Sequence, residues 1–243
     1  MSSIELPSEI FYHNLKTSYN KLGQYIHECD ILHLLKTDDS QIMSICENLV
    51  QYLKSNYAKE NEEHLNDQNC NLLSLWIYEQ LFEHLEDSSN RVLITYANFQ
   101  HMLSYVFTGD NKIQAIKCLR QLGQLGSLKN EWKKSKDLYD YCVDYDEIIK
   151  KASSSYEKCK EYEEYIQKKS PLYKEFDRLY IQAYKSENND LYKKCKNYNP
   201  IIAIPKLECD KKNLAQEMSN AFLHNFLVKI LILQKHLAMC YWE

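Results

Sequence analysis

Apolar residues recur along this chain at the spacing of amphipathic helices. Between Asp39 and Tyr57 they fall at helical intervals, which places them on one face of a helix. From Asn69 to Glu86 apolar residues occur on nearly every side, as is typical of a helix at the centre of a bundle. The pattern therefore predicts a helical protein with a central buried helix over residues 69–86.

Local signals predict where other helices begin. Arg91 to Phe107 reads as a further helix, and a long helical run starts near Ser127. Ser154 with Glu157 fits a capping box that restarts this run, and Ser170-Pro171 fits a second restart with proline in the first turn. The C-terminal half is therefore expected to contain several helices.

The last part of the chain carries two predictions. Asn197 to Cys209 includes Pro200 and Pro205, and we expect this segment to be extended. A last amphipathic helix is expected from about Leu214 to Met239, and its charged positions make it unsuited to crossing a membrane. Such a helix usually closes its own bundle, although packing on a partner helix or peripheral contact with a membrane also fits the pattern.

Glycine and proline are scarce, with four of each in 243 residues, which leaves little material for hairpins, sandwich corners or phosphate-binding loops. The fold class is therefore predicted to be all-α, a cysteine-rich helical bundle stapled by disulfides. We expect a single helical domain over residues 1–243, with an N-terminal part over about 1–108 and a C-terminal part over about 127–243.

Charge and the N-terminus exclude two classes of protein. The net charge is −4 and the predicted pI is about 6.1, with acidic and basic residues interleaved. Nucleic-acid-binding proteins usually carry a basic stripe or a high pI, so no nucleic-acid partner is expected. Met1 to Leu15 has no basic segment followed by an apolar one, so no classical signal peptide is recognised.

Nine cysteines are spread along the chain, and no two of them form a C-x-x-C pair. Zinc and dithiol redox sites usually need closely spaced thiols, whereas structural disulfides can join distant helices. We therefore predict disulfides and no metal site, and a wholly reduced protein with buried cysteines is the alternative. The disulfide candidates, whose pairing the spacing does not assign, are Cys29, Cys46, Cys70, Cys118, Cys142, Cys159, Cys195 and Cys209. Cys240 is the candidate for a free thiol.

The sequence contains no legible catalytic or cofactor-binding motif. It lacks HExxH, Walker A, G-x-G-x-x-G and G-x-S-x-G patterns. The histidines expected on helices lie at no ligand or triad spacing; they are His84, His101, His224 and His236. Asp144, Asp146 and Glu147 are expected to form a solvated helix face rather than a catalytic pair. We accordingly expect no enzyme activity, no catalytic residue and no cofactor.

Two groups of side chains are candidates for a binding surface. Basic residues are candidates for a patch that binds sulfated or sialylated glycans, with an ordinary mixed-charge surface as the alternative. They are Lys129, Lys133, Lys134, Lys136, Lys193, Lys194 and Lys196. Tyrosines on exposed faces would suit an adhesive surface, because aromatic anchors dominate interface energetics. They include Tyr139, Tyr141, Tyr145, Tyr162 and Tyr165.

Several stretches carry a resemblance to a known family. In the N-terminal part they are Leu6-Pro7-Ser8, Cys46 to Val50 with Tyr52 to Lys54, and Cys70 to Leu81 (CNLLSLWIYEQL). In the C-terminal part they are Trp132 to Ile148 (WKKSKDLYDYCVDYDEI), Cys159 to Lys168 with Leu172-Tyr173, and Tyr192 to Cys195 with Tyr198 to Pro200. In this order they resemble the variant interspersed-repeat proteins of malaria parasites, the PIR/VIR superfamily. The resemblance frames residues 6–85 and 131–209.

The resemblance implies an exported variant antigen that binds a host-cell receptor, an endothelial or erythrocyte protein or glycan, in cytoadherence or immune evasion. It places the protein in the infected erythrocyte, at the surface or in the host-cell cytoplasm. An intracellular scaffold or trafficking protein is the alternative. Many members end in a membrane-spanning helix, and this chain resembles a VIR protein without that segment. The structural bridges that the resemblance implies involve Cys29, Cys46, Cys70, Cys142, Cys159, Cys195 and Cys209.

Overall fold

The computed structural model describes most of the chain, and its regular elements there are all helices. The described residues are 6–17, 25–34, 39–57, 67–85, 89–120, 132–184 and 190–211, with short stretches at 217–218, 221–223, 226–227 and 229–230. Within these ranges the all-α prediction is confirmed. The expected helix start near Ser127 lies outside them.

The chain divides into two compact units. Unit 1 consists of Met1–Tyr145 and Pro171–Asn197, and unit 2 consists of Asp146–Ser170 and Tyr198–Glu243. These units do not follow the expected division near residues 108 and 127. Whether the whole chain folds as one domain stays a prediction.

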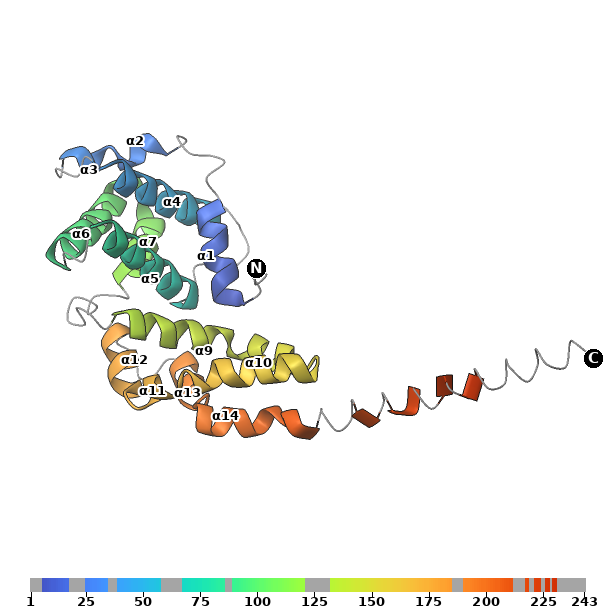
Figure 1. Ribbon diagram of the computed structural model, residues 1–243. Coiled ribbons are helices and arrows are strands. Elements are labelled where there is room, and N and C mark those ends of the chain that lie inside the picture. The colour runs from blue at the N-terminus through green and yellow to red at the C-terminus, as the bar shows by residue number, and fades with distance from the viewer. Residues whose placement is uncertain are drawn as a thin grey trace, which may run out of the picture. The chain divides into compact units, whose positions relative to one another are not determined.

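Unit 1 is built around helix α5 (Figure 1). Its first helices are α1 (Pro7–Thr17), α2 (Ile26–Cys29), α3 (Ile31–Leu34), α4 (Ser40–Tyr57), α5 (Asp67–His84), α6 (Ser89–Val106) and α7 (Gly109–Arg120). Helix α5 contacts α1, α4, α6 and α7, and Figure 1 shows it between α1 on one side and α6 on the other. The sequence places helices within two residues of these bounds for α4, α5 and α6.

The burial of α5 confirms that it is the central helix. Every residue from Cys70 to Tyr78 is buried, including two polar side chains that find partners on other helices. The Asn71 amide donates to the Tyr139 hydroxyl at 3.0 Å, and the Ser74 hydroxyl donates to the carbonyl of Cys118 at 3.1 Å. The core therefore extends around α5 rather than along one of its faces.

The rest of unit 1 contains an aromatic cluster. It is formed by the first part of α9 (Trp132–Ala152), by the end of α11 (Ser170–Tyr173), and by α12 (Phe176–Tyr184) and α13 (Asp190–Lys196). The Phe176 ring lies 5.6 Å from both the Tyr180 and Tyr192 rings, measured between centroids. Helix α9 runs from unit 1 into unit 2 after Tyr145.

Unit 2 contains the end of α9, α10 (Tyr156–Gln167) and α14 (Pro200–Leu207), and α10 packs against α14. Ser155 caps α10 by accepting a hydrogen bond from the backbone of Lys158, so the cap lies one residue after the predicted Ser154. The restarts at this point and at Ser170 are otherwise in the expected places.

The prediction that Asn197 to Cys209 is extended is wrong, because this segment contains helix α14. The Asn199 side chain accepts a hydrogen bond from the backbone of Ile201, which caps the helix. Pro200 occupies the first turn, where its fixed φ favours a helix and its missing N–H costs no hydrogen bond. Pro205 lies inside this short helix.

Four disulfides cross-link the helices, each within one unit. The pairs and their Cα–Cα distances are Cys29–Cys46 (6.1 Å), Cys70–Cys118 (4.8 Å), Cys142–Cys195 (5.2 Å) and Cys159–Cys209 (5.5 Å). These eight residues are the disulfide candidates of the sequence analysis. The predicted disulfide-stapled fold class is thereby confirmed, and Cys240 lies outside the described residues.

Candidate functional site

The first candidate site is a pocket between the start of α4 and the end of α5, and Asp39 holds its two sides together. One carboxylate oxygen of Asp39 accepts hydrogen bonds from the backbone of Gln41 at 2.9 Å and of Ile42 at 3.3 Å, which caps α4. The other oxygen lies 2.7 Å from Nε2 of His84, the last residue of α5. Burial alone would raise the pKa of Asp39, but His84 and these backbone donors hold it below its usual value.

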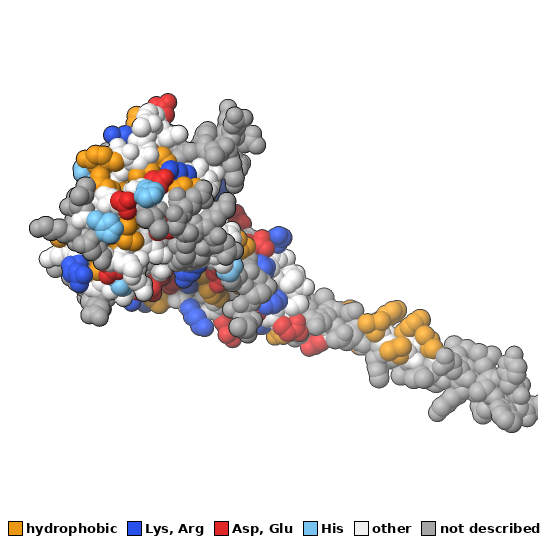
Figure 2. Space-filling model, turned by 90° about the horizontal axis from the view of Figure 1, so that it is seen from above, with side chains coloured by type: hydrophobic (Ala, Val, Ile, Leu, Met, Phe, Trp, Pro, Cys, Tyr) orange, Lys and Arg blue, Asp and Glu red, His pale blue; other side chains and the backbone are white. Residues whose placement is uncertain are grey.

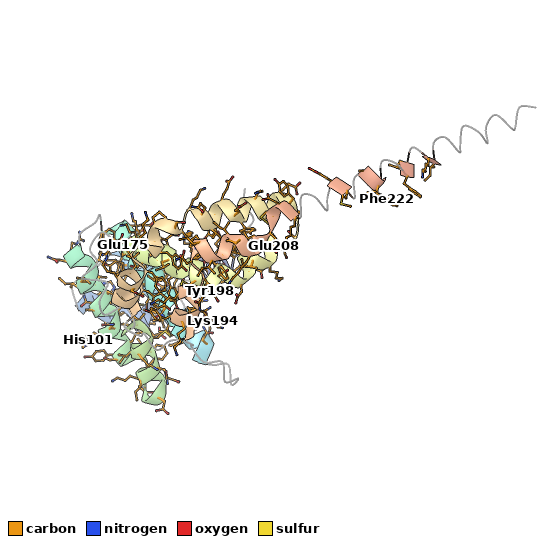
Figure 3. All side chains as sticks on the ribbon, turned by 90° about the horizontal axis from the view of Figure 1, so that it is seen from below. His101, Glu175, Lys194, Tyr198, Glu208 and Phe222 are labelled. Atoms are coloured by element: carbon orange, nitrogen blue, oxygen red, sulfur yellow. A yellow bond between two sulfur atoms is a disulfide. The ribbon has the colours of Figure 1, made fainter. Side chains whose placement is uncertain are left out.

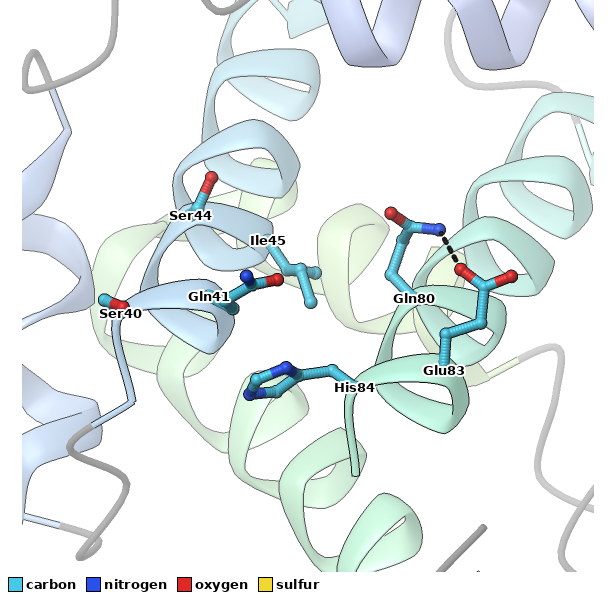
Figure 4. Close-up of a pocket in the computed structure, with 7 residues that line it drawn as sticks. All are labelled: Ser40, Gln41, Ser44, Ile45, Gln80, Glu83 and His84. Carbon is cyan, nitrogen blue, oxygen red and sulfur yellow. Dashed lines mark hydrogen bonds between the residues drawn. The ribbon is translucent and has the colours of Figure 1, made fainter. Parts of the chain in front are cut away.

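The pocket has a volume of about 480 Å³, within the usual range for small-ligand sites. The described residues that line it are Ser40, Gln41, Ser44, Ile45, Gln80, Glu83 and His84. All but Ile45 carry a polar group, and the Gln80 amide donates to the Glu83 carboxylate at 3.3 Å. In Figure 4, Gln41 and Ile45 extend from α4 and His84 extends from α5 into the space between the helices.

This arrangement resembles part of a hydrolytic triad without completing one. Asp39 and His84 form a carboxylate–imidazole pair, and Ser40 and Ser44 line the same pocket. Neither serine hydroxyl forms a hydrogen bond with His84 within the described residues. A triad needs its nucleophile within hydrogen-bond reach of the base, so the geometry favours binding over catalysis.

A second, smaller hollow of about 220 Å³ also has Glu83 in its lining. Lys136 neutralises much of its negative charge: its ammonium lies 2.8 Å from Asp140 and 3.7 Å from Glu79. The same ammonium lies 4.1 Å from the centre of the Tyr12 ring. Burial raises the pKa of both Glu79 and Asp140, with Lys136 opposing it. Lys136 is therefore a structural cation on this side of unit 1.

The predicted basic patch is spread over several ion pairs. Lys134 lies 3.5 Å from Glu175, and Lys196 lies 3.2 Å from Asp177. Lys136 is half-buried and pairs with Asp140 and Glu79. The other described members are the exposed Lys133, Lys193 and Lys194, while Lys129 lies outside the described residues. Figure 2 shows basic and acidic side chains interspersed on the visible face. Lys194 is exposed and Glu175 is half-buried. Glycan binding by this patch stays a prediction.

The tyrosines expected on an adhesive surface are instead mostly in the core. Tyr139 and Tyr141 are fully buried, and Tyr145 and Tyr162 are nearly so. Tyr165 is half-buried, and the Lys169 ammonium lies 4.4 Å from its ring. The enrichment in tyrosine therefore supplies core packing, in which the ring is buried and the hydroxyl seeks a polar partner.

Asp144 also departs from its prediction, because it is buried rather than part of a solvated face. Its carboxylate accepts hydrogen bonds from the Ser8 backbone at 2.7 Å and from the Ser8 hydroxyl at 2.6 Å. Burial raises the pKa of Asp144 to about 6, although the bonds from Ser8 oppose the shift. The expectation does hold for Asp146, which is exposed, and Glu147 is half-buried.

Exposed apolar side chains form two further candidate surfaces. On α6, Ile94, His101 and Tyr105 share one helix face, and Ile94 and Tyr105 are each 62% exposed. The His101 and Tyr105 rings meet edge to face, with centroids 5.1 Å apart. Figure 3 shows His101 on the outside of α6.

The second surface lies in the predicted last helix, of which the described residues are helical. Met218, Phe222, Phe226 and Ile230 recur every fourth residue and are all exposed. Figure 2 shows hydrophobic side chains gathered along this stretch, and Figure 3 shows Phe222 extending from it. The remaining residues of 214–239, with His224 and His236, lie outside the described part.

A family model described as Plasmodium vivax Vir protein matches residues 6–229. The chain belongs to the Vir family. The match begins just before α1, covers parts of both compact units and contains the cysteines of all four disulfides. Comparison with curated proteins and with solved structures finds no match.

Vir membership indicates a variant antigen of Plasmodium, of a family that is generally non-enzymatic. Across the described residues, no group of three or more His, Cys, Asp or Glu side chains is arranged to hold a metal ion. None of the helices described combines the length and apolar character needed to cross a membrane.

Sequence reasoning missed the pocket between α4 and α5 in this Vir protein. Asp39 signals a helix start, but its partner His84 lies 45 residues further along the chain. The lining residues Gln41, Gln80 and Glu83 read as ordinary polar positions of amphipathic helices. The packing of α4 on α5 brings these residues together, and no local sequence pattern predicts that packing.

Proposed function

We propose that this Vir protein is an exported, non-catalytic variant antigen that binds a host-cell receptor, protein or glycan, in cytoadherence or immune evasion. The observation that carries the proposal is the family match over residues 6–229. Export to the infected erythrocyte, where a host receptor is within reach, is part of the same proposal.

The disulfide frame supports a role outside a reducing compartment. Disulfides persist in oxidising surroundings and are rare in the cytosol. Three of the four bridges close loops of about 50 residues. Each of these bridges lowers the conformational entropy of the unfolded chain and so stabilises the fold by about 3–4 kcal/mol. A frame of this kind holds a binding surface rigid, which lowers the entropic cost of recognition.

Two surfaces of unit 1 are suited to receptor binding. The pocket between α4 and α5 offers polar groups for a small ligand, and the outer face of α6 offers Ile94 and Tyr105 for a protein surface. Aromatic side chains are frequent anchors in interfaces, and here Tyr105 is one that the core leaves exposed.

The test is saturable binding of the oxidised recombinant chain to a panel of endothelial cells and erythrocytes. The proposal expects binding that a reduced and alkylated sample of the same protein loses. Absence of binding to every cell type in the panel would overturn the receptor-binding proposal.

An exported scaffold or trafficking protein inside the infected cell is the second candidate function. The observation that favours it is the exposed apolar series of Met218, Phe222, Phe226 and Ile230, which is suited to packing on a partner helix or lying on a membrane surface. Protease treatment of intact infected cells separates the two functions. A surface antigen is trimmed, whereas an internal scaffold is protected until the cells are permeabilised.

A further inference from the structure

We propose that the pocket between α4 and α5 binds a neutral saccharide unit of a host glycan. The inference rests on the proposed function, because it names the chemical class of the ligand through which the antigen would contact host cells. It assigns this role to Gln41, Ser44, Gln80 and Glu83, which line the pocket from two helices.

The polar groups of the pocket match those of a polyol. The serine hydroxyls and glutamine amides both donate and accept hydrogen bonds, and the Glu83 carboxylate accepts them. Sugar hydroxyls likewise donate and accept, so they match both kinds of group. A guanidinium or ammonium group only donates, and it would leave the amide and hydroxyl donors of Gln41, Gln80 and Ser44 without acceptors.

The charge of the pocket disfavours an anionic ligand. Glu83 is exposed at the pocket, and the only hydrogen bond to its carboxylate among the described residues comes from Gln80. Lys136, which lines the neighbouring hollow together with Glu83, is occupied by Asp140 and Glu79. No lysine or arginine is among the described residues that line the pocket itself, so a sulfate or sialic acid carboxylate would meet the negative charge of Glu83 there. The pocket accordingly favours an uncharged sugar.

The walls of the pocket are held in place by contacts within the protein. The Asp39 carboxylate has a lowered pKa and is ionised near neutral pH, so it can only accept, and Nε2 of His84 must donate to it. This bond fixes the His84 ring in the lining of the pocket. The Cys29–Cys46 bridge fixes Cys46, the residue next to Ile45, which also lines the pocket. A ligand therefore meets walls that are held before it arrives, which favours affinity.

Helix register adds a further polar group to this face of α4. Asn48 follows Ser44 by one turn and Gln41 by two, so the three side chains share a face. Asn48 is 2% exposed, and neither atom of its amide has a hydrogen-bond partner within the described part of the chain. A buried amide of this kind is costly unless a polar group reaches it, so Asn48 adds a polar side chain to the α4 face that carries Ser44 and Gln41.

The test uses the full oxidised chain in saturation-transfer NMR. The probes are lactose, N-acetylglucosamine and methyl mannoside as neutral sugars, 3′-sialyllactose and a heparin disaccharide as anions, and arginine amide as a cation. The variants are Gln80→Ala and Glu83→Ala, with Gln114→Ala and Glu161→Ala as matched controls at exposed helical positions outside the pocket. We expect a signal from at least one neutral sugar, about tenfold weaker binding in each pocket variant, and unchanged binding in both controls.

Host-cell binding is measured in the same experiment, with and without the neutral sugar as competitor. Cell binding that the sugar inhibits and that Glu83→Ala weakens supports both proposals. Cell binding that neither the sugar nor the variant affects overturns the saccharide site and leaves the receptor proposal standing. A sugar signal without cell binding supports the site and overturns the receptor proposal. Signals from the anions or from arginine amide alone, or from no probe, overturn the saccharide site.

Discussion

The carboxylate of Asp39 caps helix α4 with one oxygen and accepts a hydrogen bond from Nε2 of His84 at 2.7 Å with the other. Two residues 45 positions apart thus connect the first turn of α4 with the last residue of α5. Both side chains are partly exposed, so the Asp39–His84 contact itself contributes little, and the cap contributes most of the free energy.

The first prediction separates these two contributions. Asp39→Ala should lower the free energy of unfolding by about 1–2 kcal/mol, because it removes a helix cap. His84→Ala should lower it by no more than about 1 kcal/mol, because it removes only a partly exposed pair. Urea unfolding followed by circular dichroism measures both. Because Asp39→Ala removes both the cap and the bond to His84, equal losses in the two variants would show that the cap contributes nothing measurable.

The second prediction concerns the buried carboxylate of Asp144. Its pKa of about 6 in the folded protein lies above the value near 4 of the unfolded chain. The folded state therefore binds the proton more tightly, so the stabilisation is fully present below about pH 4 and is lost as the pH rises through about 6. Asp144→Asn keeps partners for the Ser8 backbone and hydroxyl without the charge.

We expect Asp144→Asn to flatten this part of the stability–pH curve and to raise the free energy of unfolding at pH 7.4 by up to about 3 kcal/mol. Asp146→Asn, at an exposed position of the same helix, is the control and should change neither quantity. Denaturant unfolding at a series of pH values between about 4 and 8 tests this. A steeper curve or a less stable protein in Asp144→Asn would contradict it.

The third prediction distinguishes core tyrosines from surface tyrosines. Tyr141→Ala should cost about 3–5 kcal/mol of stability, because it empties a fully buried site. Tyr105→Ala should leave stability within about 0.5 kcal/mol, since its ring is mostly exposed. Thermal unfolding of both variants provides the measurement. If Tyr141 were replaced at no cost, the aromatic cluster would not be a packed core.

The fourth prediction compares the contribution to stability of the bridged cysteines with that of Cys240. Replacing Cys142 and Cys195 together by Ser should lower the free energy of unfolding by about 3–4 kcal/mol, because their bridge closes a loop of 53 residues. Replacing Cys159 and Cys209 should cost a similar amount for a loop of 50 residues. Cys240→Ser is the control, and we expect no change. Unfolding is compared in the oxidised proteins and again after reduction, where the differences should disappear.

Helix positions could be predicted from the sequence because they depend on local chemistry. The periodic apolar faces of residues 39–57 and 69–86 correspond to α4 and α5, and the all-round apolar pattern of the second marks the central helix. The same logic failed at Pro200 and Pro205, where proline was read as a sign of extended chain. Proline in the first turn is compatible with a helix once Asn199 caps it.

The candidate site could not be predicted because it depends on contacts between distant residues. Glu83 and Gln41 belong to separate helices, and only the packing of α4 on α5 places them around one pocket. The burial of Asp144 could not be predicted for the same reason. Its polar neighbours in the sequence indicate a solvated position, whereas its hydrogen-bond partner Ser8 lies 136 residues away in the chain. Residue type and spacing alone carry no information on such pairs.

The account depends on four disulfides that form when the Vir protein occupies an oxidising environment. The most direct measurement is a free-thiol count, with mapping of cross-linked peptides by mass spectrometry, on unreduced protein from infected cells. The account predicts one free thiol, at Cys240, together with the peptide pairs Cys29–Cys46, Cys70–Cys118, Cys142–Cys195 and Cys159–Cys209. Nine free thiols in a folded protein would contradict it and would favour the internal scaffold instead.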